Sequence, residues 1–352
     1  MTKSVLVGLS GGIDSAAAAF SLLTEGFRVE GLFLHNGFFG FAENEAARVA
    51  GALGIPLHVF DASAAFHDDV TSYFVRDYLE GRTPNPCIYC NKKIKFRYLL
   101  EEAAGRGIDY VATGHYARIA CEGGHFGLFK GVDTAKDQSY FLYVLGEPEL
   151  SRILFPNGNL TKEAVREIAA RAGLASSHTR ESQEICFIPD HDYVRFIEGA
   201  VNPLPIRQGT IVDLHGRILG THRGIHTVTV GQRRGLTIAS AHPLYVIDID
   251  AARNEVIVGG DEEQFFTGLV ACDVTWHLPV NDVISAMKAT VKIRYRHGGV
   301  ESDLYPSPGD ENRVTVIFSN PQKAVAPGQA AVFYQGDKII GGGWIKRGIR
   351  DE

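Results

Sequence analysis

The sequence lacks long hydrophobic runs and an excess of positive charge, and each lack excludes a class of protein. No stretch approaches the roughly 20 apolar residues that cross a membrane, and the first apolar run is too short for a signal peptide. We therefore expect a cytoplasmic protein with no membrane part. The net charge of -6 excludes nucleic-acid binding through overall positive charge, so any such contact must use local basic patches.

Cysteine is also scarce, with five residues among 352. An odd number of cysteines in a reducing compartment indicates catalytic or metal-binding roles rather than structural disulfides. Cys121, in an expected hairpin, and Cys272, in a β segment, are interpreted as simple buried thiols. The candidates for chemistry are therefore Cys87, Cys90 and Cys186.

Two common nucleotide-binding signatures, the Walker A pattern and the Rossmann glycine pattern, are missing near the N-terminus. The segment SGGIDS stands there instead, between an apolar strand and an alanine-rich helix. Its glycines let the backbone approach phosphate, while Ser10, Ser15 and the helix N-terminus attract it. Because this loop has no lysine for a γ-phosphate, it suits cleavage between the α- and β-phosphates, and we expect Asp14 to hold Mg²⁺. An isolated SGG is more often a plain turn, but its place after the first strand favours phosphate binding.

The length favours two or three domains, and the first half alternates strand and helix patterns. Such alternation predicts an α/β fold with a parallel sheet and helices on both faces. Helical periodicity disappears near residue 200, and short strand patterns follow. The predicted domains are 1–200, 201–265 (a small central β domain) and 266–352 (a C-terminal β-barrel). Strands are expected at 4–10, 28–36, 56–61 and 109–115, and helices at 16–26, 43–54, 94–107 and 161–174, the last with Thr161 as N-cap.

The segment 83–96 combines two prolines, two cysteines and three lysines. The prolines predict a rigid turn that holds Asn85 and Cys87. Lysines 92, 93 and 95 would lower the pKa of a nearby thiol and contact phosphate. The segment thus predicts a nucleophilic thiolate beside an RNA-binding surface.

Six motifs occur in order between residues 10 and 236: SGGIDS, TPNPC-x-x-CN-K-x-IKF, TGHYAR, KDQSYFL, SQ-ICF and TVGQRRGL. Together they resemble the tRNA-specific 2-thiouridylases, members of the PP-loop N-type ATP pyrophosphatases. The resemblance covers essentially the whole chain. It implies an adenine nucleotide α-hydrolase-like PP-loop domain, followed by the two β modules.

The resemblance also implies roles for single residues. Cys90 would be the nucleophile, Cys186 the cysteine that carries a persulfide, and Asp14 would assist catalysis. The residues implied in ATP binding are Gly8, Leu9, Ser10, Gly11, Gly12, Ile13, Asp14, Ser15, Leu34 and Gly114. Those implied in tRNA binding are Asn85, Pro86, Cys87, His115, Lys136, Asp137, Gln138, Arg294, Tyr295 and Gln329.

The implied reaction is ATP-dependent 2-thiolation of a wobble uridine through an adenylated base, with release of AMP and pyrophosphate. The cofactors would be ATP and Mg²⁺. The partners would be the tRNAs for glutamate, lysine and glutamine, and a cysteine desulfurase or a sulfur-relay protein.

Cys87 departs from the family pattern, which usually has an aspartate there. Two schemes fit the resulting cysteines: Cys186 carries a persulfide, or Cys87, Cys90 and Cys186 ligate a 4Fe–4S cluster that carries sulfide. A weaker third interpretation is a zinc site whose fourth ligand is His115 or another histidine. The rival functions are an adenylating enzyme for a small carboxylate or amide, and a nonenzymatic RNA-binding or iron–sulfur storage protein.

Overall fold

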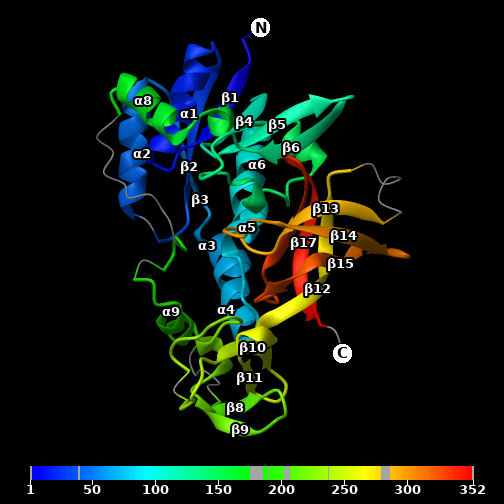
Figure 1. The fold of residues 1–352 in the computed structure, drawn as a ribbon. Coiled ribbons are helices and arrows are strands. Elements are labelled where there is room, and N and C mark those ends of the chain that lie inside the picture. The colour runs from blue at the N-terminus through cyan, green and yellow to red at the C-terminus, as the bar shows by residue number, and fades with distance from the viewer. Residues whose placement is uncertain are drawn as a thin grey trace. The chain divides into compact units, whose positions relative to one another are not determined.

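The computed structural model describes residues 2–38, 40–174, 185–188, 190–201, 207–236, 238–278 and 286–350 (Figure 1). The chain forms two compact units, which are treated separately. The first unit consists of residues 1–71, 87–183 and 336–340, and the second of 72–86, 184–335 and 341–352.

A five-stranded sheet forms the centre of the first unit. All its neighbouring strands are parallel, in the order β3-β2-β1-β4-β7. The central strand β1 is apolar and buried on both faces, as its sequence predicts. The predicted parallel α/β sheet is therefore confirmed. Its strands are β1 (Ser4–Gly8), β2 (Arg28–His35), β3 (Leu57–Asp61), β4 (Tyr110–Ala112) and β7 (Ile153–Leu154).

Helices cover both faces of this sheet (Figure 1). Val5 and Val7 of β1 share a core cluster with residues of α1, α2 and α8. A Cβ at Gly8 would lie on the opposite face, 3.3 Å from the side chain of Leu99 of α6. The predicted helices are thus confirmed at α1 (Ile13–Thr24), α2 (Gly40–Leu53), α6 (Phe96–Gly105) and α8 (Lys162–Arg171).

The cap of α8 and the hairpin with Cys121 are two short features that the sequence predicts. Thr161 caps α8 as predicted, since its side chain accepts a hydrogen bond from the backbone N–H of Ala164. The expected hairpin exists as β5 (Ala117–Glu122) and β6 (His125–Lys130). Cys121, however, is exposed and not a buried thiol, because it pairs with Phe126 beside the hairpin turn, outside the core.

Much of the segment between β3 and α6 is helical, although the sequence predicted a turn around the cysteines. That prediction is wrong from Pro86 onward, because proline is favoured at the first position of a helix, where no N–H is needed. The helical pieces are α3 (Ser63–Phe66), π-helix His67–Thr71, α4 (Ser72–Leu79), α5 (Pro86–Cys90) and π-helix Asn91–Lys95. Shorter pieces follow at 3₁₀-helix Ser139–Phe141, α7 (Glu147–Leu150) and 3₁₀-helix Pro156–Asn159.

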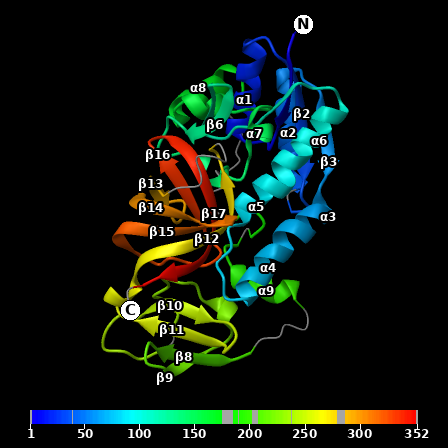
Figure 2. The same ribbon diagram turned by 90° about the vertical axis from the view of Figure 1, so that its right-hand side faces the viewer.

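A small sheet in the second unit has the order β10-β11-β8-β9 (Figure 2). Its core is aliphatic and includes Ile211, Val246 and Val256. Helix α9 (Tyr193–Ala200) lies in the same unit, where Phe196 packs edge-on against Phe74 of α4. The strands are β8 (Gly209–Asp213), β9 (Ile218–His222), β10 (Tyr245–Asp250) and β11 (Glu255–Gly259), with 3₁₀-helices at Ile225–Thr227 and Glu262–Gln264.

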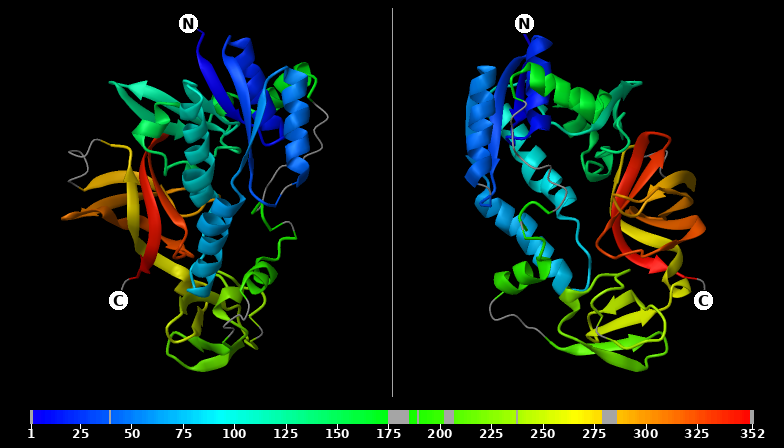
Figure 3. Two further views of the ribbon diagram at one scale, coloured as in Figure 1. Left: turned by 180° about the vertical axis from the view of Figure 1, so that it is seen from behind. Right: turned by 60° about the vertical axis from the view of Figure 1, so that its left-hand side comes forward.

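Six further strands close into a barrel (Figure 3). Strand β12 pairs with both β15 and β17, so the barrel has no open edge. The predicted C-terminal barrel is therefore confirmed. Its strands are β12 (Phe265–Trp276), β13 (Met287–Lys292), β14 (Val300–Ser307), β15 (Asp310–Lys323), β16 (Ala330–Gln335) and β17 (Lys338–Ile349).

Cys272 lies on β12 and is half-buried. Its thiol donates to the carbonyl of Trp344, and burial raises the pKa of the thiol. No helix in the described part of the chain has the length and apolar character to cross a membrane.

Candidate nucleotide site and cysteine helix

The loop between β1 and α1 is shaped for close approach of a ligand. Gly11 has a φ of +78°, and a Cβ there would meet the Cβ of Glu45 at 2.6 Å, so the position requires glycine. The hydroxyl of Ser15 accepts from the Ser10 N–H at 3.2 Å and donates to the Gly12 carbonyl at 3.0 Å. Gly12 is the N-cap of α1 and has no side chain to cap it, so the positive helix end faces the loop.

Gly114, in the segment after β4, lies against this helix start. A Cβ at Gly114 would meet the backbone of Asp14 at 2.5 Å and the N–H nitrogen of Ser15 at 2.7 Å. The buried side chain of Asn157 donates to the carbonyls of Asp14 at 2.9 Å and of Gly114 at 3.1 Å. The two predicted nucleotide segments are therefore adjacent, and Asn157, which the sequence analysis missed, ties them together.

The carboxylate of Asp14 already has a counter-ion. The Lys162 ammonium donates to its two oxygens at 2.7 and 2.9 Å, and the Tyr116 hydroxyl donates to Oδ1 at 2.7 Å. The Lys162 side chain is 6% exposed and the Asp14 side chain 37%. A carboxylate is the type of ligand that Mg²⁺ prefers, so Asp14 fits the predicted role, but the metal would have to share the carboxylate with this ammonium or displace it.

Lys162 and Tyr116 were also missed by the sequence analysis. Lys162 follows the predicted N-cap Thr161 and begins α8, so its place at a helix start could have been read from the sequence. Tyr116 lies within TGHYAR. Their convergence on Asp14 could not be read, because it depends on how α8 and the segment after β4 pack.

His115 is held as a neutral ring. Its Nε2 lies 3.4 Å from the Lys95 ammonium, which can only donate, so Nε2 accepts and Nδ1 carries the proton. Nδ1 then donates to the Thr113 hydroxyl at 2.7 Å. The ring packs against Phe96 and Phe155, which also contact each other, and burial, followed by the charge of Lys95, holds the pKa of His115 well below its ordinary value.

The predicted tRNA segment 136–138 is fixed mainly by its own side chains. The buried Asp137 carboxylate accepts from the N–H of Gly131 and from Ser139, each at 3.0 Å. The Gln138 side chain accepts from the Tyr116 N–H at 3.0 Å. Lys136 is half-exposed. Asp137 and Gln138 therefore shape the turn, and Lys136 is the cation on it.

Cys87 and Cys90 lie on α5, one helical turn apart, so they share a face of the helix. Cys87 is exposed and Cys90 is half-buried. The segment is anchored by the fully buried Ile88 and by the side chain of Asn91, which donates to the carbonyl of Phe141 at 3.0 Å. The two thiols are followed directly by the lysines of the π-helix Asn91–Lys95, so the predicted order of cysteines and a basic helix start is present, while the role of a thiolate there stays a prediction.

In the second unit, Gln329 holds the chain that leads into α5. Its amide donates to the carbonyls of Thr83 at 3.0 Å and Pro84 at 3.3 Å, and the Thr83 N–H donates to Pro327 at 2.8 Å. Asn85 is buried within this segment. Gln329 and the predicted base-binding residues Asn85 and Pro86 are thus part of one local structure.

The remaining predicted residues belong to the second unit. Cys186 is half-buried and belongs to the second unit, whereas Cys87 and Cys90 belong to the first. Residues 182–184 of the SQ-ICF motif lie outside the described residues. Arg294 is exposed on the barrel, where it donates to the Lys323 carbonyl, and Tyr295 is half-exposed. Within neither unit do three His, Cys, Asp or Glu side chains of the described residues form a group that could hold a metal ion.

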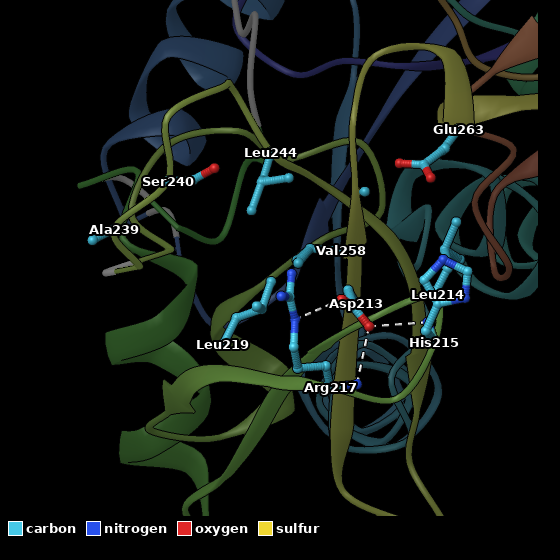
Figure 4. Close-up of a pocket in the computed structure, with 11 residues that line it drawn as sticks. Asp213, Leu214, His215, Arg217, Leu219, Ala239, Ser240, Leu244, Val258 and Glu263 are labelled. Atoms are coloured by element: carbon cyan, nitrogen blue, oxygen red, sulfur yellow. Dashed lines mark hydrogen bonds and ion pairs between the residues drawn. The ribbon is translucent and has the colours of Figure 1, made fainter.

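A pocket of about 300 Å³ lies over the small sheet of the second unit (Figure 4). Asp213 in this pocket accepts from the backbone and side chain of Arg217, at 2.9 and 3.1 Å. These bonds hold the pKa of Asp213 below its ordinary value. None of the predicted site residues lines the pocket.

Comparison with known proteins matches most of the chain, in three parts. Residues 3–190 match the family model described as a tRNA methyl transferase HUP domain. Residues 196–260 match a tRNA methyl transferase PRC-barrel domain, and residues 266–345 an aminomethyltransferase beta-barrel domain.

Several curated proteins are similar over nearly their full length. The tRNA-specific 2-thiouridylase MnmA 2 of Syntrophus aciditrophicus is 49% identical over 91% of this chain and 99% of that protein. The tRNA-specific 2-thiouridylases MnmA of Geobacter metallireducens and Geotalea uraniireducens are 46% and 45% identical, over 97% and 99% of this chain and 96% of each relative. Because the similarity runs through all three parts and almost the whole of each relative, this chain belongs to the family of tRNA-specific 2-thiouridylases.

Proposed function

We propose that this protein uses ATP to replace the 2-oxo oxygen of a wobble uridine in tRNA with sulfur. The observation that carries the proposal is the glycine-containing loop after β1, which leads into the N-terminus of α1 without a side-chain cap and has Gly114 packed against it. The cysteine pair on α5 supplies the second requirement, a nucleophile. The names of the relatives supply the substrate class, tRNA, and the modified base, 2-thiouridine.

In the first step the 2-oxo oxygen of the uridine attacks the α-phosphate of ATP. The bond between the α- and β-phosphates breaks, pyrophosphate leaves, and the base carries AMP on its oxygen. The loop amides and the hydroxyls of Ser10 and Ser15 would bind the phosphate oxygens as negative charge develops on them. Bound Mg²⁺ would neutralise further charge on the phosphates, with Asp14 as its ligand.

In the second step a persulfide on Cys186 attacks C2 with its terminal sulfur, and AMP leaves with the original oxygen. The thiolate of Cys90 then attacks Sγ of Cys186, which releases 2-thiouridine and leaves a Cys90–Cys186 disulfide. Two electrons from a cellular reductant reopen this disulfide. The sulfur would come from a cysteine desulfurase, directly or through a relay protein.

A second sulfur source is a 4Fe–4S cluster held by Cys87, Cys90 and Cys186. Anaerobic purification followed by iron and acid-labile sulfide analysis decides between the two sources. Iron-free protein that thiolates tRNA from a persulfide donor supports the persulfide route. About four irons per chain, with activity that follows iron content, would assign the sulfur to the cluster instead.

The tRNA is proposed to contact both units. His115 and Lys136 of the first unit, and Asn85, Pro86, Arg294, Tyr295 and Gln329 of the second, are the proposed contacts, with Cys87 beside the target base. Asp137 and Gln138 would act by holding the turn that carries Lys136. The acceptors are proposed to be the tRNAs for glutamate, lysine and glutamine.

The test is an assay with unmodified tRNA, ATP and a persulfide donor, in which the digested nucleosides are analysed by mass spectrometry. We expect 2-thiouridine only when ATP is present. ATP cleavage that tRNA does not stimulate would favour an adenylating enzyme for a small molecule. Binding of tRNA without ATP cleavage would favour a nonenzymatic RNA-binding protein.

A further inference from the structure

Lys162 is a buried cation to which no motif of the sequence assigns a role. It begins α8, and its side chain is 6% exposed although it carries an ammonium group. Its position is well fixed: its backbone N–H donates to the Asp133 carboxylate at 2.9 Å, and Thr161 caps the same turn. Val165 and Ala169 of α8 belong to the core of the first unit, so the helix does not depend on Lys162 for anchorage.

Burial of this charge requires compensation. An ammonium is costly to remove from water unless it is paired, and a pair is often no more stabilising than apolar residues of the same size. The partner here is Asp14, the second residue of α1, at 2.7 and 2.9 Å. The pair therefore places a lysine ammonium beside the phosphate loop, which has no lysine of its own.

The two members of the pair differ in their freedom to move. Asp14 is 37% exposed, so its carboxylate can turn toward solvent or a divalent cation. Lys162 lies over the ring of Tyr116, 5.8 Å from the ring centre, and is nearly enclosed. A phosphate group at the start of α1 would compete with the carboxylate for this ammonium, since phosphate oxygens are strong acceptors for charged donors.

We propose that Lys162 is the phosphate-binding cation of this site. It pairs with Asp14 when no nucleotide is bound, and it donates to the β- or γ-phosphate when ATP is bound. Lys162 thus supplies from α8 the charge that a Walker-type loop supplies from within itself. This inference rests on the proposed use of ATP.

The test is a binding cycle with inorganic pyrophosphate, measured by calorimetry on the full chain without Mg²⁺. We expect Lys162→Met to weaken binding about tenfold or more, because a charged donor is lost. Asp14→Asn should bind at least as well as the original protein, since repulsion is removed while the ammonium stays. The double variant should then be as weak as Lys162→Met.

The double variant separates a phosphate contact from an indirect effect. If Lys162 only neutralises Asp14, the double variant will bind pyrophosphate as Asp14→Asn does, and the inference is wrong. Unchanged binding by Lys162→Met overturns it as well. Should Lys162→Met fail to fold, comparison of Asp14→Asn with the double variant, which has no uncompensated charge, still decides the question.

Controls keep this inference apart from the proposed function. Arg171→Ala removes an exposed cation from the same helix and should leave binding unchanged, whereas Lys162→Arg should retain most of it. AMP, which lacks the β- and γ-phosphates, should bind all variants equally, and equal losses of AMP and pyrophosphate would overturn the inference. Failure of the original protein to bind either ATP or pyrophosphate would instead contradict the proposed function.

Discussion

At the scale of single residues, Gly114 allows two segments to touch. Changing Gly114 to Ala would place a methyl group 2.5 Å from the backbone of Asp14, so either the helix start or the segment after β4 must shift. We expect a loss of about 1 to 3 kcal/mol in unfolding free energy, and weaker ATP binding. Thermal unfolding and calorimetry measure the two effects. Gly105→Ala, where a Cβ would meet nothing within 4 Å, is the matched control.

The neutral His115 predicts a pH dependence of stability. Its pKa in the folded protein lies well below the ordinary value of about 6.5, so the unfolded chain binds more protons in mildly acidic solution. The contribution of His115 to the unfolding free energy is therefore fully present above about pH 6.5 and is lost as the pH decreases. The loss is at most about 1.4 kcal/mol per pH unit, and it is smaller to the extent that solvent screens the ring.

Urea unfolding at several pH values measures this effect, and His115→Gln is the comparison. The variant should lose less stability on acidification than the original protein. His222 and His297 also have pKa values lowered by burial and contribute to both proteins, so only the difference between the two curves counts. Parallel curves would contradict the assignment of a neutral His115.

Replacement of single cysteines should affect thiolation activity differently. Under the persulfide route, Cys90→Ser and Cys186→Ser should each abolish thiolation and leave ATP binding intact. Cys121→Ser changes an exposed thiol in the β5–β6 hairpin and should have full activity. Nucleoside analysis after a thiolation assay measures all three, and 2-thiouridine formed by either of the first two variants would refute the route.

At the scale of structural elements, Gln329 fixes the extended chain before α5. Gln329→Ala leaves the carbonyls of Thr83 and Pro84 without this donor, and we expect a loss of about 1 to 2 kcal/mol in unfolding free energy. The Thr83 amide, bonded to Pro327, should exchange its hydrogen faster. Gln335→Ala, which removes one exposed bond to Lys288, is the control and should leave that exchange unchanged.

The elements that the sequence predicts well have strong local signals. Helices α1, α2, α6 and α8 show clear helical patterns, and β1 is an uninterrupted apolar strand. Helix α5 was missed because prolines 84 and 86 suggest a turn. Pro86 instead begins the helix, and the preceding residues are held open by Gln329, more than 240 positions away along the chain.

The same distinction applies to the site. The phosphate loop and the cysteine pair are contiguous in sequence and could be predicted from it. The pairing of Asp14 with Lys162, and the bridge from Asn157 to Gly114, join residues that are far apart in sequence. Such contacts depend on the packing of α8 and of the turn 156–159, which no local pattern specifies.

At the scale of the whole molecule, the parallel sheet and the C-terminal barrel agree with the prediction. The domain boundaries at 200 and 265 stay a prediction. The family matches end at 190, 260 and 345, whereas the compact units divide the chain differently, with 72–86 assigned to the second unit. Composition does not reveal that a short segment belongs to a different unit from the residues on either side of it.

The net charge of -6 makes tRNA binding by the whole molecule depend on local cations such as Lys92, Lys93 and Lys95. Binding should therefore weaken as salt increases, with a slope that reflects the number of phosphates bound by cations. Changing Lys92 and Lys93 to alanine should make the slope shallower, by roughly one for each phosphate that is no longer neutralised. Titrations at several salt concentrations measure it, and an unchanged slope would remove these lysines from the interface.

We propose that the 2-oxo oxygen of the uridine is activated by adenylation before sulfur replaces it. The fate of this oxygen can be followed with tRNA whose target uridine carries oxygen-18 at the 2-oxo position, in a reaction with ATP and a persulfide donor. We predict that the label appears in the phosphate of AMP, with one AMP for each 2-thiouridine formed. Label found in water, pyrophosphate or orthophosphate would contradict the claim.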